Sequence, residues 1–281
     1  MREAFRRELL PASLLHFLAA DGLSNYYRMF RSGLAPHVGG PREAEALLAE
    51  VCARAFERRY ALLRAKFSHL PDPVSEPRAV GLVMGGLSFS PLRPKSAFMF
   101  SRVGGGPRGT RDGARVLRWL APVSARDRWE EITTHLGETL IALTEELPKT
   151  VRGANAILGK VCFEGGAKYA AALKKSLALP DHPDSAIEVL RMGEYVFRVN
   201  PEHWHASDGP TMTGYLEGTA CPWYSAPGWG GMHCGIFGQY QSGIASVFGM
   251  KYHLTQTIPK HGGHTCRVDL RPLTQLRPKP S

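Results

Sequence analysis

The last third of the chain concentrates the side chains that could do chemistry. Six of the eleven histidines and three of the five cysteines lie there. All of them except His253 are in the stretches EHWHASDGP, GTACPWYSAPGWGGMHCG and KHGGHTC. An ionised thiol is a nucleophile, and an imidazole transfers protons near neutral pH. The block therefore predicts a thiol-dependent site, a metal site, or turns that merely carry polar side chains.

Two cysteines are the candidate nucleophiles. Cys234 opens a predicted helix, whose N-terminal partial charge favours a thiolate, and His233 stands beside it. Cys221 ends a predicted strand, because the following Pro222 terminates strand pairing. Trp223 could wall an apolar pocket next to that thiol. Each of these residues could equally belong to the core.

A Gly-Gly turn between the last two predicted strands carries His261 and His264. Cys266 alternates with Val268 and Leu270, which places its thiol on the apolar face of its strand. We interpret this segment as a hairpin that lends histidines to the rim of a pocket. Its cysteine lines the floor of that pocket or fills the core.

Zinc is the alternative to thiol chemistry, because His261, His264, Cys266 and Cys234 could supply four nitrogen and sulfur ligands. However, the chain has no Cys-x-x-Cys pair, and the two histidines span a turn rather than one helix face. We therefore expect no cofactor and keep a zinc site as the alternative.

Composition narrows the class of protein. The net charge is +10, and residues 1–128 hold 21 Lys and Arg against 11 Asp and Glu, whereas residues 129–281 hold 14 of each. No basic run interleaved with aromatic residues indicates a nucleic-acid surface, so the basic half is a solvated face or a contact for a protein partner or oligomer. Five cysteines argue against a disulfide framework. Without a signal peptide or an 18-residue apolar run, we expect a cytoplasmic protein with no membrane span.

Hydrophobic periodicity predicts an α+β fold, with a helical N-terminal part packed on a C-terminal antiparallel sheet that carries one long helix. The predicted helices are 2–20, 42–68, 126–147, 153–177 and 231–248. The predicted strands are 188–199, 211–221, 251–258 and 265–270, with short strands also expected near 81–89 and 97–103. The predicted organisation is a helical segment 1–70, a Pro/Gly/Arg-rich connection or insertion 71–126, a site-bearing unit 127–272 and a tail 273–281.

The order of motifs in the C-terminal block resembles the L-2-amino-thiazoline-4-carboxylic acid hydrolase family, and loosely the vinyl-4-reductase-like small-molecule-binding domains. The resemblance covers roughly residues 185–272. The motifs that carry it are Cys221-Pro222, His233-Cys234-Gly235, Leu254-Thr255-Gln256-Thr257, His261-Gly262-Gly263 and Cys266-Arg267-Val268-Asp269.

The resemblance implies a hydrolase of a small cyclic amidine or a related carbon–nitrogen bond. A thiolate of Cys221 or Cys234 would attack the carbon, and His233 or His264 would move protons. A carboxylate would hold the cationic nitrogens of the substrate. The residues expected to bind the substrate are Asp208, Glu217, Trp223, Tyr240 and Arg267.

Simpler interpretations stand beside these roles. Asp208 fits a turn in Ser-Asp-Gly-Pro, and Arg267 fits an exposed strand position. The alternative function is a non-catalytic module that binds a small molecule or a metal within a larger assembly.

Overall fold

The computed structural model describes residues 2–51, 124–199, 201–207, 212–258 and 265–273. The chain divides into two compact units, one of residues 1–10 with 158–281 and the other of residues 11–157. This division differs from the predicted boundaries at 70 and 126. Nearly all of the predicted insertion, its two short strands and most of the basic excess lie outside the described residues.

The unit of residues 11–157 is helical where it is described. Helix α2 packs against α6, and residues 41–51 are also helical. The predicted helix 2–20 is in fact two helices: the first ends at Arg6, Glu8 takes a left-handed φ of 55°, and the second begins after Pro11. The elements of this unit are α2 (Ala12–Val38), α6 (Ala125–Glu146) and a 3-10 turn (Leu147–Lys149).

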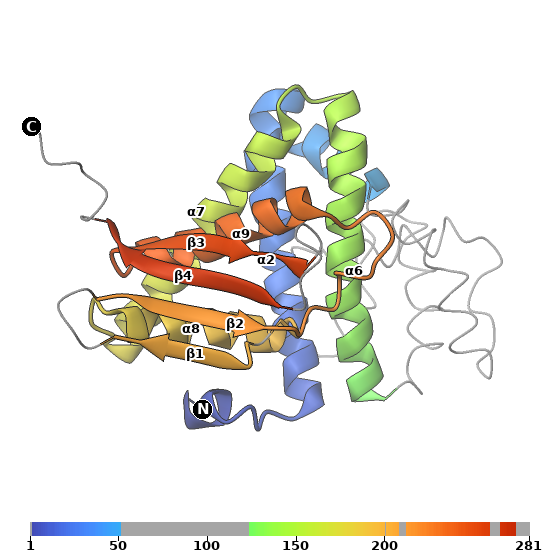
Figure 1. The fold of residues 1–281 in the computed structure, drawn as a ribbon. Helices are drawn as coiled ribbons and strands as arrows, with labels where there is room; N and C mark the ends of the chain where they lie inside the picture. The colour runs from blue at the N-terminus through green and yellow to red at the C-terminus, as the bar shows by residue number, and fades with distance from the viewer. Residues whose placement is uncertain (1, 52–123, 200, 208–211, 259–264, 274–281) are drawn as a thin grey trace, which may run out of the picture. The chain divides into compact units, whose positions relative to one another are not determined.

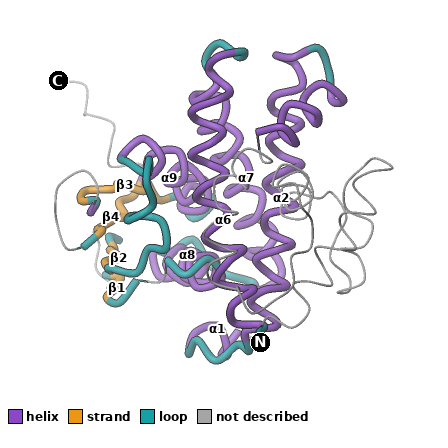
Figure 2. Tube along the Cα trace, turned by 90° about the vertical axis from the view of Figure 1, so that its right-hand side faces the viewer, coloured by secondary structure: helices purple, strands orange, loops and turns teal. Residues whose placement is uncertain are grey.

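The second unit contains a four-stranded sheet and the helices that cover it. All its strand pairs are antiparallel, in the order β1-β2-β4-β3 (Figure 1). Helices α8 and α9 lie on one face of this sheet, which confirms the α+β class (Figure 2). The elements are α1 (Arg2–Arg6), α7 (Ala154–Leu177), α8 (Pro183–Val196), β1 (His203–Ala206), β2 (Gly214–Gly218), α9 (Gly231–Ser246), β3 (Met250–Gln256) and β4 (Cys266–Pro272).

The sheet register separates two chemically different faces. Leu216 of β2 pairs with Val268 of β4, and both are buried on the side of the helices. The next pair along, Glu217 with Arg267, points to the opposite side because successive side chains alternate across a strand. We call these the inner face and the open face.

Helix α8 corrects one prediction. Residues 188–199 were expected as a strand, but they lie mostly in a helix that begins at Pro183, and the His182 ring accepts a hydrogen bond from the Asp184 N–H at 3.2 Å. The helical period is present in the sequence, because Asp184, Glu188 and Arg191 are four and three positions apart and form the less buried side of α8. The strand prediction did not use this spacing. The first strand of the unit is instead β1, in the stretch HWHA.

The crossing of α7 and α9 depends on two glycines. A Cβ atom at Gly166 would lie 1.9 Å from the Tyr240 carbonyl oxygen, and one at Gly243 would lie 2.0 Å from the Phe163 carbonyl oxygen. Only glycine allows two backbones to approach this closely. The position of α9 over the inner face is therefore set by these two residues.

The first ten residues belong to the sheet unit because they hold α8 from outside. The Glu188 carboxylate accepts hydrogen bonds from Arg2 and, at 2.9 Å, from Arg6. Phe5 contacts Tyr195 edge to face, with ring centroids 6.4 Å apart. Among the described residues, no helix is long and apolar enough to cross a membrane.

Candidate functional site

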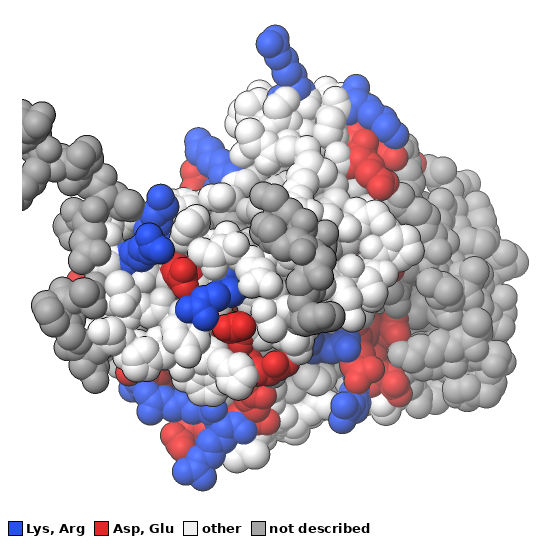
Figure 3. Space-filling view, in the orientation of Figure 1, with Lys and Arg blue, Asp and Glu red and all other residues white. Residues whose placement is uncertain are grey.

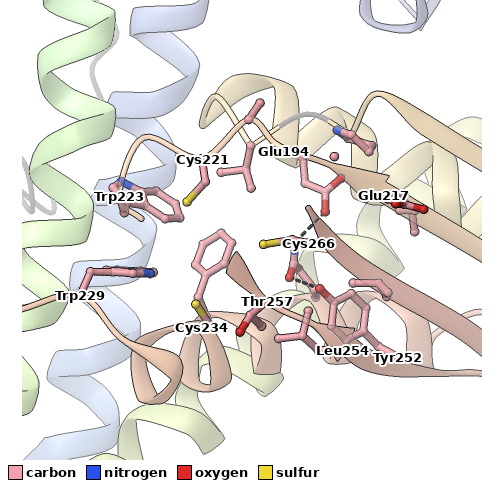
Figure 4. A pocket seen from close by; sticks show the side chains of 18 residues that line it. Glu194, Glu217, Cys221, Trp223, Trp229, Cys234, Tyr252, Leu254, Thr257 and Cys266 are labelled. Atoms are coloured by element: carbon pink, nitrogen blue, oxygen red, sulfur yellow. Dashed lines mark hydrogen bonds between the residues drawn. The ribbon is translucent and has the colours of Figure 1, made fainter. Parts of the chain in front are cut away.

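A pocket of about 90 Å³ lies in the sheet unit, between the inner face of the sheet and helices α8 and α9. Its walls come from β2, β3, β4, the two helices and the loop that follows β2. A cavity of this volume holds several waters or a small organic group. Figure 4 shows the side chains that surround it.

Three thiols line this pocket. Cys221 lies in the loop after β2, Cys234 in the first turn of α9, and Cys266 at the start of β4 on the inner face. Figure 4 shows their three sulfur atoms facing the same space. A fourth described cysteine, Cys162, is buried in α7 away from the pocket. The fold thus brings together sulfur atoms that are up to 45 residues apart in the sequence.

The pocket does not by itself activate these thiols. Burial raises the pKa of Cys221 to about 11, against an opposing effect of hydrogen bonds from the backbone N–H groups of Trp223 and Tyr224. Burial also raises the pKa of Cys234, and the indole N–H of Trp229 opposes that rise. The thiols of Cys221 and Cys234 are therefore mostly neutral at neutral pH.

Glu194 of α8 is the most unusual residue of the site. Its side chain lines the pocket with only 8% of the residue exposed, and burial raises the pKa of its carboxyl group to about 8. Its Oε1 accepts a hydrogen bond of 2.6 Å from the Gln241 amide, whereas its Oε2 is buried without a partner among the described residues. A buried carboxyl oxygen without a partner is costly, which marks this group as a candidate for function.

Gln241 and Tyr252 connect Glu194 to the sheet. The Tyr252 hydroxyl of β3 donates a hydrogen bond to the Gln241 side-chain oxygen, and the Gln241 nitrogen then donates to Glu194 (Figure 4). Gln241 is itself buried in α9. The carboxyl group is therefore held from one side, and its free oxygen remains on the other.

Aromatic side chains form one wall of the pocket. Trp223 is only 1% exposed, and its ring centroid lies 5.2 Å from that of Trp229 and 4.9 Å from that of Phe237. The Trp229 indole nitrogen is buried without a hydrogen-bond partner of standard geometry among the described residues, although it influences the Cys234 thiol. This wall limits the access of water and offers flat faces to a ligand.

Two predicted site residues on α9 lie away from the pocket lining. The His233 ring accepts a hydrogen bond of 3.0 Å from the Gly230 N–H at the start of the helix and stacks on Trp229. Its Nδ1 thus caps the helix, and proton transfer by His233 stays a prediction. Tyr240 stacks on Tyr169 at 6.2 Å and packs against the hydrophobic core.

Glu217 is one of the residues that line the pocket, whereas Arg267 is not, and the carboxylate of Glu217 pairs with Arg267 on the open face. Arg267 pairs with Glu217 at 2.9 Å and with Asp269 at 3.2 Å, and its guanidinium lies 4.4 Å from the centre of the Tyr215 ring. Figure 3 shows basic and acidic side chains side by side on this face. The Glu217 carboxylate therefore meets an arginine of the protein, where the sequence predicted a substrate cation.

The remaining predicted site residues, Asp208, His261 and His264, lie outside the described residues. No histidine is part of the pocket lining within the described ranges. In the same part of the chain, no group of three or more Cys, His, Asp or Glu side chains is arranged to hold a metal ion. The predicted zinc ligands Cys234 and Cys266 both line the pocket, and no described third ligand joins them in a metal-binding group.

Sequence reasoning missed Glu194, Gln241 and Tyr252. Once residues 183–196 are a helix, Ile187, Leu190 and Glu194 follow a spacing of three and four and share one face. A carboxylate on an otherwise apolar helix face is a recognisable signal, because acidic residues are rarely fully buried. The wrong strand prediction for this segment concealed that signal.

No protein-family model matches this sequence, and no curated protein matches it.

Proposed function

We propose that the protein is a thiol-dependent hydrolase of a carbon–nitrogen bond in a small cyclic amidine or a related compound. The observation that supports this proposal is the meeting of three thiols and a buried carboxyl group in one small pocket. Nucleophilic addition to the amidine carbon requires at least a thiol and a proton-transfer group in the same pocket. The proposal also agrees with the family that the C-terminal motifs resemble.

Cys221 is one nucleophile candidate, and two backbone N–H groups favour its thiolate against the opposing effect of burial. Its sulfur would add to the amidine carbon, and the electron pair of the carbon–nitrogen double bond would move to nitrogen. Glu194 would relay the thiol proton to that nitrogen, the carbon–nitrogen bond would break, and water would then release the carbon from sulfur. Cys234 is the alternative nucleophile on the opposite wall.

Turnover of 2-amino-thiazoline-4-carboxylate by the full chain tests this proposal. We expect Cys221→Ser to abolish turnover and Glu194→Gln to lower kcat by about 10²–10⁴-fold, the usual range for loss of a proton-transfer group. Cys162→Ser is the matched control, because this thiol is buried outside the pocket. No turnover by the wild type, or full turnover by both Cys221→Ser and Cys234→Ser, would exclude thiol catalysis of this reaction.

A second candidate function is a non-catalytic binding module for a small molecule. The raised pKa values of Cys221 and Cys234 favour it, because neutral thiols are poor nucleophiles. Alkylation distinguishes the two functions. A hydrolase should show one pocket thiol that reacts faster with iodoacetamide when a substrate analogue is present, whereas in a binding module the ligand should only protect the thiols.

A further inference from the structure

We propose that Glu194 Oε2 is the recognition atom of a site for a planar organic cation, held in place by Gln241 and Tyr252 as positioning residues. This inference deepens the proposed function, on which it rests, because the same pocket would receive the substrate. It names the charge and shape of the ligand and two residues that no catalytic role requires.

The geometry of the carboxyl group carries the inference. Oε1 accepts the amide N–H of Gln241 at 2.6 Å, and Gln241 is fixed in turn by the Tyr252 hydroxyl. Oε2 is buried in the pocket and has no partner among the described residues. Among the described residues, the positive charge that acts on this carboxyl group is that of Arg191, which donates no hydrogen bond to Oε2. A bound cation would supply a second charge together with an N–H donor.

Within the described ranges, the groups around Glu194 do not provide a hydrogen-bond donor for its Oε2. Arg191 of α8 acts on the carboxyl group electrostatically, and its Nε is buried without a hydrogen-bond partner among the described residues. Its guanidinium carbon lies 3.5 Å from the centre of the Trp204 ring, and its Nη2 lies 3.6 Å from Glu8 Oε1. Tyr252 of β3 is a neutral donor. The thiols of Cys221 and Cys234 are neutral as well. Glu217 also lines the pocket, and its carboxylate pairs with Arg267.

The walls of the pocket select the shape of the cation. Trp223, Trp229, Phe237 and Tyr252 surround the space with flat aromatic rings. A planar, delocalised cation of the guanidinium or amidinium type is weakly hydrated, stacks on such rings and donates N–H groups in its own plane. A compact ammonium ion would lose more hydration energy in the same place.

Calorimetric titration of the full chain with methylguanidinium and with methylurea tests the inference. These two probes share shape and N–H donors and differ in charge. At pH 8.5 we expect methylguanidinium to bind at least about tenfold more tightly, the scale of one charge-assisted hydrogen bond. Glu194→Gln should remove the difference, and the control Glu164→Gln, an exposed carboxylate of α7, should keep it. Equal binding of the two probes, or an unchanged preference in Glu194→Gln, would overturn the inference.

Proton release provides a second measurement that needs no variant. Since the pKa of Glu194 is about 8, its carboxyl group is mostly protonated at pH 7 and must ionise to meet a cation. Binding of methylguanidinium at pH 7 should therefore release close to one proton, seen as a dependence of the binding heat on the buffer. The affinity should rise with pH up to about pH 8 and then level off. An affinity that stays the same from pH 4 to pH 9 would contradict the role of Glu194.

The positioning role has its own test. In Tyr252→Phe the Gln241 amide is no longer fixed, so the carboxylate loses part of its N–H donation and the pH midpoint of cation binding should move upward. Tyr169→Phe, which removes another buried hydroxyl outside the pocket, should keep the wild-type midpoint. An unchanged midpoint in Tyr252→Phe would exclude positioning by this pair.

The proposed function and this inference can fail separately. Cation binding that depends on Glu194, without hydrolysis of any amidine, would overturn the hydrolase and leave the cation site. Hydrolysis that survives in Glu194→Gln, with no preference for the charged probe, would overturn the cation site and leave the hydrolase.

Discussion

A glutamate on the open face of the sheet and a glutamate beside its inner face differ in the partners of their carboxyl groups. On the open face, the Glu217 carboxylate pairs with Arg267, and Asp269 pairs with the same guanidinium. On the inner side, the Glu194 carboxyl group has one amide partner and one oxygen without any partner among the described residues. Both sides of the sheet therefore carry carboxyl groups. They differ in whether those groups have hydrogen-bond or ion-pair partners.

This difference shows where to look for function. Exposed charged networks contribute little to stability, and water or salt can replace their partners. A buried oxygen without a partner raises the free energy of the folded state, and the remaining contacts of the fold must offset that cost. Such a cost is expected where a ligand will later supply the missing partner.

The largest expected effect on stability comes from a substitution that moves α9 out of its place over the inner face. Gly243→Ala places a Cβ atom against the Phe163 carbonyl oxygen and should push α9 away from α7, at a cost of about 3 kcal/mol in the free energy of unfolding. Denaturant unfolding measures this loss. The control is Gly235→Ala, whose Cβ has open space on the same helix and should stabilise by up to about 1 kcal/mol. Similar stabilities of the two variants would show that the close crossing of α7 and α9 is not required.

The next largest effect is on the pH dependence of stability, in which Glu194 and Glu217 should differ. Folding raises the pKa of Glu194 from 4.5 to about 8, so the protonated form is preferred in the folded state. The stability that this preference provides is complete below about pH 4.5 and is lost as the pH rises through 8. Glu194→Gln removes this loss and should gain on the order of 2–4 kcal/mol in stability relative to wild type between pH 5 and pH 8.5.

Glu217→Gln is the matched variant on the open face. Its carboxylate pairs with a partly exposed arginine, so the stability difference from wild type should change by less than about 1 kcal/mol over the same pH range. Thermal unfolding of both variants at pH 5 and pH 8.5 decides the comparison. Parallel pH profiles for Glu194→Gln and Glu217→Gln would remove the distinction between the faces.

The smallest effect concerns the open face alone. Arg267→Gln breaks the pairs with Glu217 and Asp269 and the contact with Tyr215, and we expect a cost of about 0–1 kcal/mol. About 1 M salt should abolish most of that cost, because it screens exposed charges. A larger cost that resists salt would mean that the open face is as tightly coupled to the fold as the inner face.

Part of the fold and of the site could be predicted from local sequence. Strong periodicity located α6, α7 and α9 and the last two strands, and alternation placed Cys266 with Val268 and Leu270 on the inner face. Helix α8 was predicted wrongly, although Asp184, Glu188 and Arg191 follow helical spacing, because the predicted strand began at Glu188 and left out the first turn of the helix. With α8 taken as a strand, Glu194 had no reason to point into a pocket.

The sequence by itself determined the α+β class, the candidate thiols and the end of β4 that holds Cys266, because these depend on residue type and on periods of a few positions. Only the tertiary structure decided which groups meet. It directs His233 to cap α9, turns Glu217 toward Arg267, and brings Glu194, Gln241 and Tyr252 from three separate elements beside three thiols. These choices depend on how helices and strands pack, and the close approach of α7 and α9 at two glycines is set by contacts between residues about eighty positions apart.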